Sequence, residues 1–596
     1  MRTLSELFYY SVETYRKPDH LLRKKDGAWV PMSSDAFGAA VEEFSMGLRT
    51  LGIEKGERVA ILSENRPEWM IADLATLCLG GVSVPAYATL PPAQIRHILI
   101  DSESRVVVVS NETQGRKLDE IRSALPWLRH VIRMDPPAPS GSLSFDEVRA
   151  RGREALSTDR LAVRRRADEV EPGDLATLIY TSGTTGEPKG VMLSHSNILA
   201  NIHGAAKAFP LIGRTDMALS FLPLSHAFER TVTYFWLRTG AAIAFAESVE
   251  KVPENLQELK PTVMCSVPRL YEKIYARVQE NVSAGSAVSR KIFAWAMGVG
   301  RETFRCRLED RKPSVWLRAK RAAADALVFG KITARTGGRM QLFVSGGAPL
   351  AKEIAEFLGA VGFTVCEGYG LTETSPVITA NRPDKMRPGS VGLPLEGVEV
   401  RIAEDGEILT RGAHVMMGYY RKPEATAEII DPDGWLHTGD IGIVDTDGFL
   451  VITDRKKDII VTSGGKNIAP QPIENRLKAD AFVTEVVMIG NRRNYPTALV
   501  VPSFVVLEKW AKDTGVVYAT RDELVLHPKV IELYMKRISD LTEDLATFER
   551  IKKVALLPNE FTLEAGELTP TLKVKRRVVE ERYRAVIEKL YEGGGS

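Results

Sequence analysis

The sequence has little of what marks secreted, metal-stapled or membrane-spanning proteins. Only four cysteines occur in 596 residues, and no two of them have the C-x-x-C spacing. We therefore expect neither a disulfide framework nor a structural zinc site, and we expect a reducing compartment, the cytoplasm. The longest uncharged stretch, residues 74–95, is interrupted by two glycines and three prolines, so it predicts buried helix, turn and strand rather than a membrane span.

An excess of charge of one sign is also missing. The chain has 79 basic and 77 acidic residues, a formal charge of +2, which gives no electrostatic reason to expect nucleic acid as a partner. Glu6 and Glu13 interrupt the segment where a signal peptide would need an apolar core. What is present is an ordinary globular composition, 44% hydrophobic and 26% charged, at a length that suggests several structural units.

The order of the predicted elements indicates an α/β fold. Apolar runs at 58–63, 82–86 and 105–110 predict buried strands, and the spacing of apolar residues over 33–51 predicts a helix. This alternation predicts a largely parallel sheet within a large N-terminal domain of α/β subdomains. From about Val398, Asp-Gly turns between short strands predict a β-rich subdomain, and the charged segment 151–172 is predicted to be an exposed connection.

A second, smaller domain is predicted after the charged run Asp454-Arg-Lys-Lys-Asp458. Beyond it the pattern changes to a compact α+β arrangement, with a helix near 471–479 and strands near 483–489 and 497–502. We predict an N-terminal domain over 1–454, a hinge over 455–458, a mobile C-terminal domain over 459–592 and a flexible tail over 593–596. A hinge between strands allows the small domain to rotate as a rigid body.

The most specific motif is Thr181-Ser-Gly-Thr-Thr-Gly-Glu-Pro-Lys-Gly190, which follows an apolar strand at 175–180. Its glycines let the backbone present N–H groups to an anion, its hydroxyls add donors, and Lys189 adds a positive charge. It is not a Walker A loop, because Pro188 and Gly190 stand where that motif needs glycine and Ser/Thr. The segment therefore predicts a phosphate-binding loop of another kind.

A second motif joins Ser345-Gly-Gly-Ala-Pro-Leu350 to the segment 363–373 and predicts a βαβ unit. Ligands favour the C-terminal ends of the strands in such units. Tyr369 stands between glycines, where its ring can lie flat on a purine, and Glu373 offers a carboxylate to a magnesium ion carried on phosphates. The alternative, a buried core tyrosine and a helix-capping glutamate, stays open.

A third motif, Gly434-Trp-Leu-His-Thr-Gly-Asp440, is followed by Asp454-Arg455 in the β-rich part. A carboxylate accepts hydrogen bonds well from two neighbouring ribose hydroxyls, and an arginine can hold the sugar or phosphate side of a nucleotide. Simple turn chemistry is the alternative, since Gly-Asp and Asp-Gly pairs occur in any β-rich region.

These segments, in this order and spacing over about residues 5–580, resemble the adenylate-forming superfamily of acyl-CoA synthetases, luciferases and nonribosomal-peptide adenylation domains. Four segments are most similar to the long-chain fatty acyl-CoA synthetases: 222–230, 454–460, 464–470 and 568–573. The resemblance implies a ligase that uses ATP and magnesium to convert a long-chain fatty acid to acyl-AMP, with release of pyrophosphate. It then implies transfer of the acyl group to coenzyme A.

The resemblance also implies roles for single residues. The β- and γ-phosphates of ATP would be held by Thr181, Ser182, Gly183, Thr184, Thr185, Gly186 and Lys189, and magnesium by Thr184 and Glu373. The adenine pocket and its edge would consist of Gly347, Ala348, Pro349, Tyr369, Gly370 and Thr372, and the ribose would be bound by Asp440 and Arg455. In the acyl and thiolation parts, the implied residues are His226 beside the carboxylate, the mobile catalytic Lys573, the hinge residue Lys457, and Gly464, Gly465 and Lys466 beside the pantetheine path.

The segment after His226 departs from part of the family. In some relatives an aromatic gate to the acyl tunnel stands four residues after this histidine, where this chain has Arg230. A gate would then come from Tyr234, Phe235 or Trp236, unless that aromatic run is simple core. The alternative interpretation of His226 is that it is a histidine buried in the core. The length of the preferred acyl chain is therefore not predicted.

Other functions remain open on the same scaffold. A fatty acyl-AMP ligase would pass the acyl group to a carrier protein, although the intact Gly464–Lys466 segment favours coenzyme A. A non-catalytic sensor would be expected to lack the charged positions that this chain keeps, and nothing supports a luciferase-type oxidation. The region from Lys291 to Arg335 mixes Arg and Lys with Trp, Phe and Leu, so it predicts either a solvated helical face or a weak membrane-surface patch. Peripheral contact with the inner face of the membrane and a homodimer both stay open.

Overall fold

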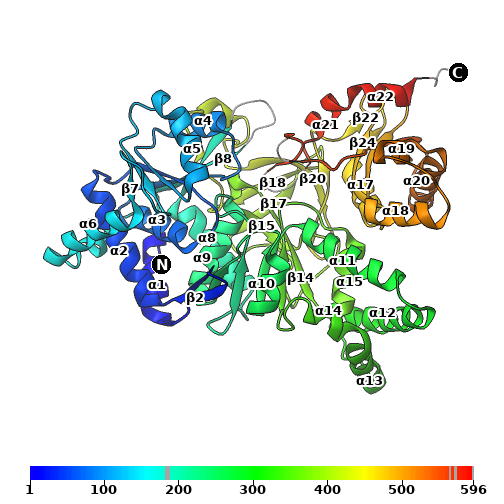
Figure 1. Cartoon of the computed structure of the whole chain (residues 1–596), viewed down its shortest axis with the longest axis horizontal. Coiled ribbons are helices and arrows are strands. Elements are labelled where there is room, and N and C mark those ends of the chain that lie inside the picture. The colour runs from blue at the N-terminus through cyan, green and yellow to red at the C-terminus, as the bar shows by residue number, and fades with distance from the viewer. Residues whose placement is uncertain (182–187, 563–564, 570–573, 593–596) are drawn as a thin grey trace.

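The computed structural model describes residues 1–181, 188–562, 565–569 and 574–592. Two large sheets and a smaller β-rich sheet form an N-terminal body, and the last part of the chain forms a separate lobe (Figure 1). The N-terminus lies on the body, whereas α22 (Arg584–Tyr591), the last helix of the described residues, lies in the lobe, far from it.

The first large sheet has the strand order β19-β9-β8-β4-β3-β5-β6-β7. Strands β8, β4, β3, β5 and β6 run parallel, as predicted, and β9 turns back antiparallel to β8. The strand bounds are β3 Arg58–Leu62, β4 Val82–Ala86, β5 Val106–Val109, β6 His130–Arg133, β7 Leu143–Ser144, β8 Leu175–Thr181, β9 Lys189–Ser194 and β19 Gly418–Tyr419. The hairpin partner β9 was not predicted from the sequence.

The second large sheet has the order β16-β15-β14-β13-β12-β10-β11-β1-β2. Its strands are β1 Leu21–Lys25, β2 Ala28–Met32, β10 Met217–Ser220, β11 Ala242–Phe245, β12 Val263–Ser266, β13 Leu342–Ser345, β14 Thr364–Gly370, β15 Val377–Ala380 and β16 Leu393–Pro394. Strands β13 and β14 are parallel and joined by α15 (Lys352–Val361), which confirms the predicted βαβ unit.

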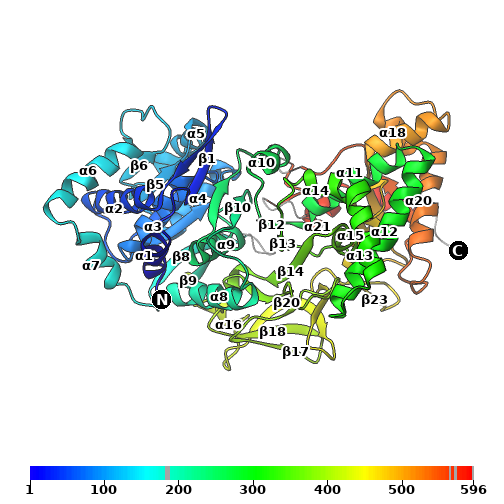
Figure 2. The same cartoon turned by 90° about the horizontal axis from the view of Figure 1, so that it is seen from below.

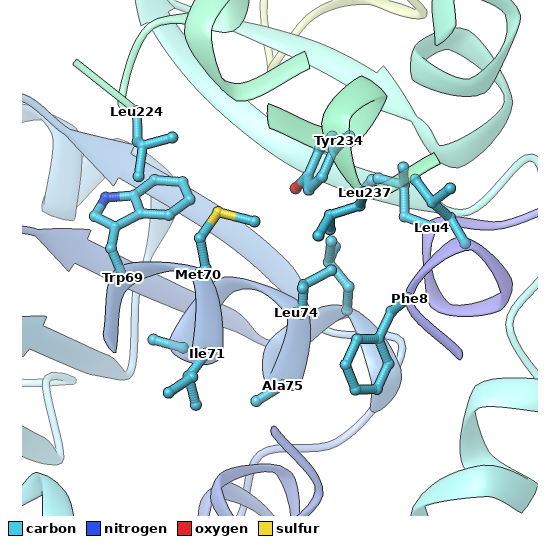
Figure 3. Packing of buried hydrophobic residues seen from close by; sticks show 14 of the residues in the cluster. Leu4, Phe8, Trp69, Met70, Ile71, Leu74, Ala75, Leu224, Tyr234 and Leu237 are labelled. Carbon is cyan, nitrogen blue, oxygen red and sulfur yellow. The ribbon is translucent and has the colours of Figure 1, made fainter. Parts of the chain in front are cut away.

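Helices bury apolar faces between and around these sheets. In Figure 3, Trp69, Met70 and Leu74 of α3 lie toward Tyr234 and Leu237 of α9, with α1 beside them. This shared core fixes the two sheets relative to each other. The helices of the body are α1 Leu4–Tyr15, α2 Ser34–Thr50, α3 Pro67–Cys78, α4 Pro92–Ser102, α5 Glu112–Ile121, α6 Phe145–Thr158, α7 Ala162–Asp168, α8 His195–Ala208, α9 Ala227–Thr239, α10 Val252–Leu259, α11 Pro268–Ser283, α12 Ala287–Leu308, α13 Val315–Ala324, α14 Gly330–Ala334 and α16 Pro423–Ala427.

The prediction of an exposed connection over 151–172 is wrong. Helix α6 continues to Thr158, and α7 follows and buries Ala162, Val163 and Ala167 against the core. The charged residues occupy the outer faces of these helices, and a charge count alone hides the apolar positions between them.

The β-rich sheet and the C-terminal lobe follow in the order the sequence predicted. The sheet is β17-β18-β20-β21, with bounds Val398–Ile402, Glu407–Gly412, Leu436–Val444 and Leu450–Arg455. The lobe has strands β22 Ile460–Val461, β23 Asn467–Ile468, β24 Val483–Ile489, β25 Thr497–Pro502 and β26 Lys553–Leu556, and helices α17 Pro470–Lys478, α18 Phe504–Asp513, α19 Arg521–Leu526, α20 Pro528–Leu541, α21 Arg576–Arg582 and α22 Arg584–Tyr591. All four cysteines are free and buried. Within the described ranges, no helix has the length and apolar character needed to cross a membrane.

Candidate functional site

The predicted phosphate loop closes a β-hairpin. Thr181 at the end of β8 lies directly opposite Lys189 at the start of β9. Ser182, Gly183, Thr184, Thr185 and Gly186 lie outside the described residues. The sheet therefore holds both ends of the loop, and Lys189 stands at its exit.

A tyrosine connects Lys189 to Glu373. Strand β19 pairs with β9, which places Tyr419 beside the hairpin. The Lys189 Nζ lies 4.9 Å from the centre of the Tyr419 ring, and the Tyr419 hydroxyl donates a hydrogen bond of 2.8 Å to Glu373 Oε1. Burial raises the pKa of Tyr419, which keeps the phenol a neutral donor. Tyr419, which no sequence motif singled out, thus brings together two residues from separate predicted motifs.

Glu373 suits the magnesium role. It lies in the short helix η3 (Thr372–Thr374), half-buried, and its Oε2 accepts no hydrogen bond from any described residue. Across the described ranges, no group of three or more His, Cys, Asp or Glu side chains is placed to hold a metal. Magnesium bound through substrate phosphates needs only one or two carboxylates, so the residue present fits the ion.

The turn after β13 carries Gly347, Ala348 and Pro349, the residues predicted to line the adenine pocket. Gly347 has φ +83°, a left-handed conformation that glycine adopts without strain. A Cβ on Gly346 would lie 2.9 Å from the Phe228 ring, so a larger residue here would require that ring to shift. Ala348 and Pro349 are exposed. The turn is therefore open at the C-terminal end of a parallel strand, where such sheets bind ligands.

The second and third predicted motifs meet at Asp440. The Tyr369 hydroxyl donates a 2.7 Å hydrogen bond to Asp440 Oδ2, and Arg455 Nε lies 3.2 Å from Asp440 Oδ1. Asp440 and Arg455 are directly opposite in β20 and β21. The Tyr369 side chain is only 8% exposed, so a ligand can meet just part of the ring. Gly370 and Thr372 follow on the same segment, between Tyr369 and Glu373.

Asp440 gives a direct test of the nucleotide site. We expect Asp440→Asn to raise the KM for ATP about 10-fold to 100-fold, because a hydrogen bond to a charged group is worth about 1.5–3 kcal/mol. The KM for the acid should change little. Asp433→Asn, which alters an exposed turn near the same sheet, is the matched control. Steady-state kinetics with ATP and acid varied separately would check this, and an unchanged KM for ATP would contradict the assignment.

His226 is neither a core histidine nor fully exposed. It is half-buried at the N-cap of α9, where its Nδ1 accepts a 3.1 Å hydrogen bond from the Phe228 N–H. Phe228 in turn contacts the glycine turn at Gly346. The histidine is therefore positioned by the first turn of α9, next to the glycine turn after β13.

Arg230 is part of a buried network. It forms an ion pair with Asp73 of α3, and it donates hydrogen bonds to Thr177 Oγ1 at 2.6 Å and to the Tyr234 hydroxyl at 2.9 Å. Tyr234 also donates to Asp73. Phe235 and Trp236 are buried in the same core. Tyr234, Phe235 and Trp236 are therefore core residues, and this structure provides no observation for a gate among them.

Glu229 carries a pH dependence. It is 2% exposed, Ser220 donates a 2.5 Å hydrogen bond to its Oε1, and its Oε2 has no partner among the described residues. Burial raises the pKa of Glu229 to about 8. The folded state therefore holds a proton that the unfolded state releases near pH 4.5, so this carboxyl lowers stability as the pH rises from about 4.5 to 8.

We expect Glu229→Gln to remove this contribution. Relative to the original chain, the variant should gain about 1 kcal/mol or more in unfolding free energy between pH 6 and pH 8. Urea unfolding at both pH values measures the difference, with the exposed Glu424→Gln as control. A difference that stays constant with pH would show that Glu229 is ionised throughout.

The predicted hinge coincides with a turn between the body and the lobe. Strand β21 ends at Arg455, and Lys456 Nζ bonds to Asp405 and Glu407 at 2.6 and 3.0 Å. Asp454 Oδ2 accepts a 3.3 Å hydrogen bond from the Gln471 N–H in α17. Burial raises the pKa of Asp454 to about 6. The Lys456 ion pairs tie the turn to the body, and the Asp454 hydrogen bond ties the end of β21 to α17 of the lobe. The domain bounds stay predictions.

Three of the remaining predicted residues belong to the lobe. Gly464, Gly465 and Lys466 form the exposed turn between β22 and β23, where Gly465 has φ +73° and Lys466 Nζ lies 5.8 Å from the centre of the Phe548 ring. Lys573 lies outside the described residues. Lys457 is exposed in the hinge turn.

Sequence comparison decides the family. Residues 13–420 match the family described as AMP-binding enzyme, and residues 457–594 match the AMP-binding enzyme C-terminal domain. The chain belongs to the AMP-binding enzyme family. The two matched segments meet near the turn that carries Lys456, in agreement with the body and lobe of the structure.

Relatives of this AMP-binding enzyme extend over nearly its whole length. The long-chain-fatty-acid–CoA ligase FadD15 of Mycobacterium tuberculosis is 37% identical over 578 residues, covering 96% of this chain and 95% of that protein. The peroxisomal long chain acyl-CoA synthetase 7 of Arabidopsis thaliana is 34% identical, covering 99% and 86%. The crystal structure of the anthranilate CoA ligase AuaEII in complex with anthranoyl-AMP has a TM-score of 0.74 at 21% identity, covering 99% and 98%, which shows the shared fold.

Proposed function

We propose that this AMP-binding enzyme activates a long-chain fatty acid with ATP, forming acyl-AMP and pyrophosphate, and then transfers the acyl group to coenzyme A. The observation that carries the proposal is the convergence of Lys189, Glu373 and Asp440, linked through Tyr419 and Tyr369, at the end of β14. The names of the full-length relatives supply the substrate class.

The arrangement of residues suits adenylation. A fatty acid carboxylate attacks the α-phosphorus of ATP and pyrophosphate leaves, so negative charge develops on phosphoryl oxygens. Fixed positive groups and N–H donors lower the energy of that transition state. Lys189 and the loop from Thr181 would hold the β- and γ-phosphates, and Asp440 with Arg455 would hold the ribose. Bound magnesium, with Glu373 as one ligand, would supply further positive charge to the phosphates.

The second step needs a change at the same pocket. Acyl-AMP hydrolyses readily, so the site must exclude water until the thiol of coenzyme A attacks the acyl carbon and AMP leaves. We propose that rotation at 455–458, with Lys457 as the hinge residue, withdraws Lys573 and brings Gly464–Lys466 beside the pantetheine path. The Lys456 pairs with Asp405 and Glu407 and the Asp454 contact with Gln471 are the interactions that such a rotation would have to rearrange.

The order of product formation tests the proposal. With ATP, magnesium and saturated acids from short to long chain, we expect pyrophosphate release that is greatest for the long acids. Acids that show no selection for length, or pyrophosphate release only with a short or aromatic acid, would contradict the substrate class. Slow release with bound acyl-AMP and no thioester would indicate the fatty acyl-AMP ligase, although the intact Gly464–Lys466 segment supports coenzyme A as acceptor.

Location and assembly are part of the same proposal. Four buried free cysteines support a reducing compartment, and we propose the cytoplasm. Contact with the inner face of the membrane would give access to a substrate that partitions into lipid, and a homodimer stays a prediction.

A further inference from the structure

One helical hairpin concentrates the positive charge of the chain. We call residues 286–335 the basic hairpin; it consists of α12, α13, the π-helical segment η2 (Asp325–Phe329) and α14. It contains twelve Lys and Arg against four Asp and Glu, a net charge of +8, whereas the rest of the chain has 67 basic and 73 acidic residues, a net charge of −6. Figure 2 shows α12 and α13 together on the face of the body seen from below. The near-neutral total therefore hides a strongly polarised molecule.

The inner face of the second helix of the hairpin is fixed to the body. Leu317 and Ala324 are buried, and Arg321 donates 2.6 Å hydrogen bonds to the carbonyl oxygens of Ala360 and Val361 at the end of α15. Arg321 also pairs at 2.8 Å with Asp325, which directly follows α13 and begins η2. These contacts set which side of α13 points outward.

The outward face of α13 and η2 exposes large apolar and aromatic side chains. Val315 is 70% exposed, Trp316 80% and Leu327 52%. Ala319 and Ala323 are exposed on the same side of α13 as Trp316, three and seven residues after it, and Lys320 flanks them on that side. A tryptophan left almost fully in water is costly, because burial of such a ring is strongly favourable.

Unpaired cations surround this apolar stripe. Arg318, Lys320, Lys331 and Arg335 are exposed, and none of them has an ion pair with any residue in the described ranges. On α12, Val288, Ile292 and Trp295 are exposed at helical spacing beside Arg290 and Lys291. Cationic side chains flanking exposed Trp and aliphatic side chains on a helix are the pattern of helices that lie in a membrane interface.

We propose that the basic hairpin docks the enzyme on an anionic lipid bilayer, with Trp316 and its apolar neighbours at the boundary between headgroups and acyl chains. The proposed function enters this proposal only as the reason for docking: the contact would bring the enzyme to the lipid phase that holds a long-chain acid. Each Lys or Arg near an anionic bilayer strengthens binding, and the net charge of −6 elsewhere turns this face toward the membrane.

The apolar stripe favours lipid over other anionic partners. A nucleic acid backbone would use the cations but would leave Val315 and Leu327 in water, since phosphate contacts come from charged and polar groups. A second copy of the chain would bring another set of unpaired cations against this one. A bilayer with acidic headgroups can pair with the cations and also bury the apolar stripe.

A site-specific probe tests the contact. Because the four native cysteines are buried, Trp316→Cys can be labelled selectively with an environment-sensitive dye in the full chain. We expect dye emission to rise severalfold with equimolar phosphatidylcholine–phosphatidylglycerol vesicles, to fall back at high salt, and to change little with pure phosphatidylcholine. Leu211→Cys, at a position 85% exposed outside the hairpin, is the matched control and should not respond. No rise at position 316, or equal rises at both positions, would overturn the proposal.

Charge-reversal variants distinguish membrane binding by the basic hairpin from the enzymatic reaction. Arg318→Glu with Lys320→Glu should weaken vesicle binding about tenfold or more, while Lys509→Glu with Lys512→Glu on exposed α18 should not. Both variants should keep the activity of the unchanged chain toward acid supplied in solution. An inactive chain that still binds vesicles would refute the proposed function alone. Equal weakening by both variants, tighter binding to duplex DNA than to vesicles, or a dimer that Trp316→Ser dissociates would refute the docking surface.

Discussion

Replacing Lys573 by alanine is expected to lower the rate of adenylation about 100-fold to 1,000-fold, the effect of removing one group that stabilises developing charge in a transition state. Formation of the thioester from supplied acyl-AMP and coenzyme A should stay within a few-fold of the original rate. The reason is the division of labour proposed above, in which Lys573 serves only the first half-reaction.

The described residues on either side of 570–573 contact the C-terminal lobe. Leu568 is buried and forms a β-bridge with Val574. Arg576, just after, donates hydrogen bonds to Glu474 Oε1 at 2.6 Å and to the Met488 carbonyl oxygen at 2.5 Å. A rotation of the lobe would therefore move both flanks of the segment that contains Lys573.

Both half-reactions should be measured on the same preparation. Lys589→Ala removes an exposed lysine from α22 in the same lobe and controls for loss of charge. An equal loss of both half-reactions in Lys573→Ala would contradict the alternation, because it would mean that the lysine acts throughout or that the lobe is damaged.

The second large effect concerns stability rather than catalysis. Arg230→Leu is expected to destabilise the N-terminal body by about 3–5 kcal/mol, since it leaves the carboxylate of Asp73 buried without its ion pair. The network joins α3, α9 and β8, so its loss acts on the contact between the two large sheets. Urea unfolding followed by tryptophan fluorescence would measure the change.

Two further variants identify the cause. Asp73→Leu with Arg230→Leu should cost clearly less than the sum of the two single changes, because no buried charge is left without a partner. Arg411→Leu breaks an exposed ion pair with Glu399 and should cost about 1 kcal/mol or less. Additive single effects would show that Arg230 stabilises the core by packing alone.

Much of the fold followed from local pattern. The βαβ unit around α15, the parallel strands β3 to β5 and the β-rich sheet all have the periodicity and turn residues that their structures require. The error at 151–172 arose because the buried Ala162, Val163 and Ala167 are few among many charges, and only the packing of α7 shows their purpose.

The sequence singles out candidate site residues one motif at a time, and it does not show the contacts between them. Glu373, Tyr369 and Asp440 stand out locally, whereas the links between them depend on strand pairing across long stretches of sequence. Tyr419 is the clearest case, since nothing near it distinguishes it from Tyr420, and only the pairing of β19 with β9 places its ring over Lys189. Arg230 is the opposite case, a residue that stood out in the sequence but is buried in the core. Its partner Asp73 lies far away in the chain, so the sequence alone could not assign Arg230 to the core.

The most direct test of the central claim is the CoA dependence of product formation. The enzyme is incubated with ATP, magnesium and a long-chain saturated acid, with and without coenzyme A, and AMP, pyrophosphate and acyl-CoA are quantified together. The account predicts acyl-CoA and AMP in equal amounts, formed over many turnovers only when coenzyme A is present. Multiple turnovers without coenzyme A, or bound acyl-AMP that coenzyme A does not consume, would contradict it.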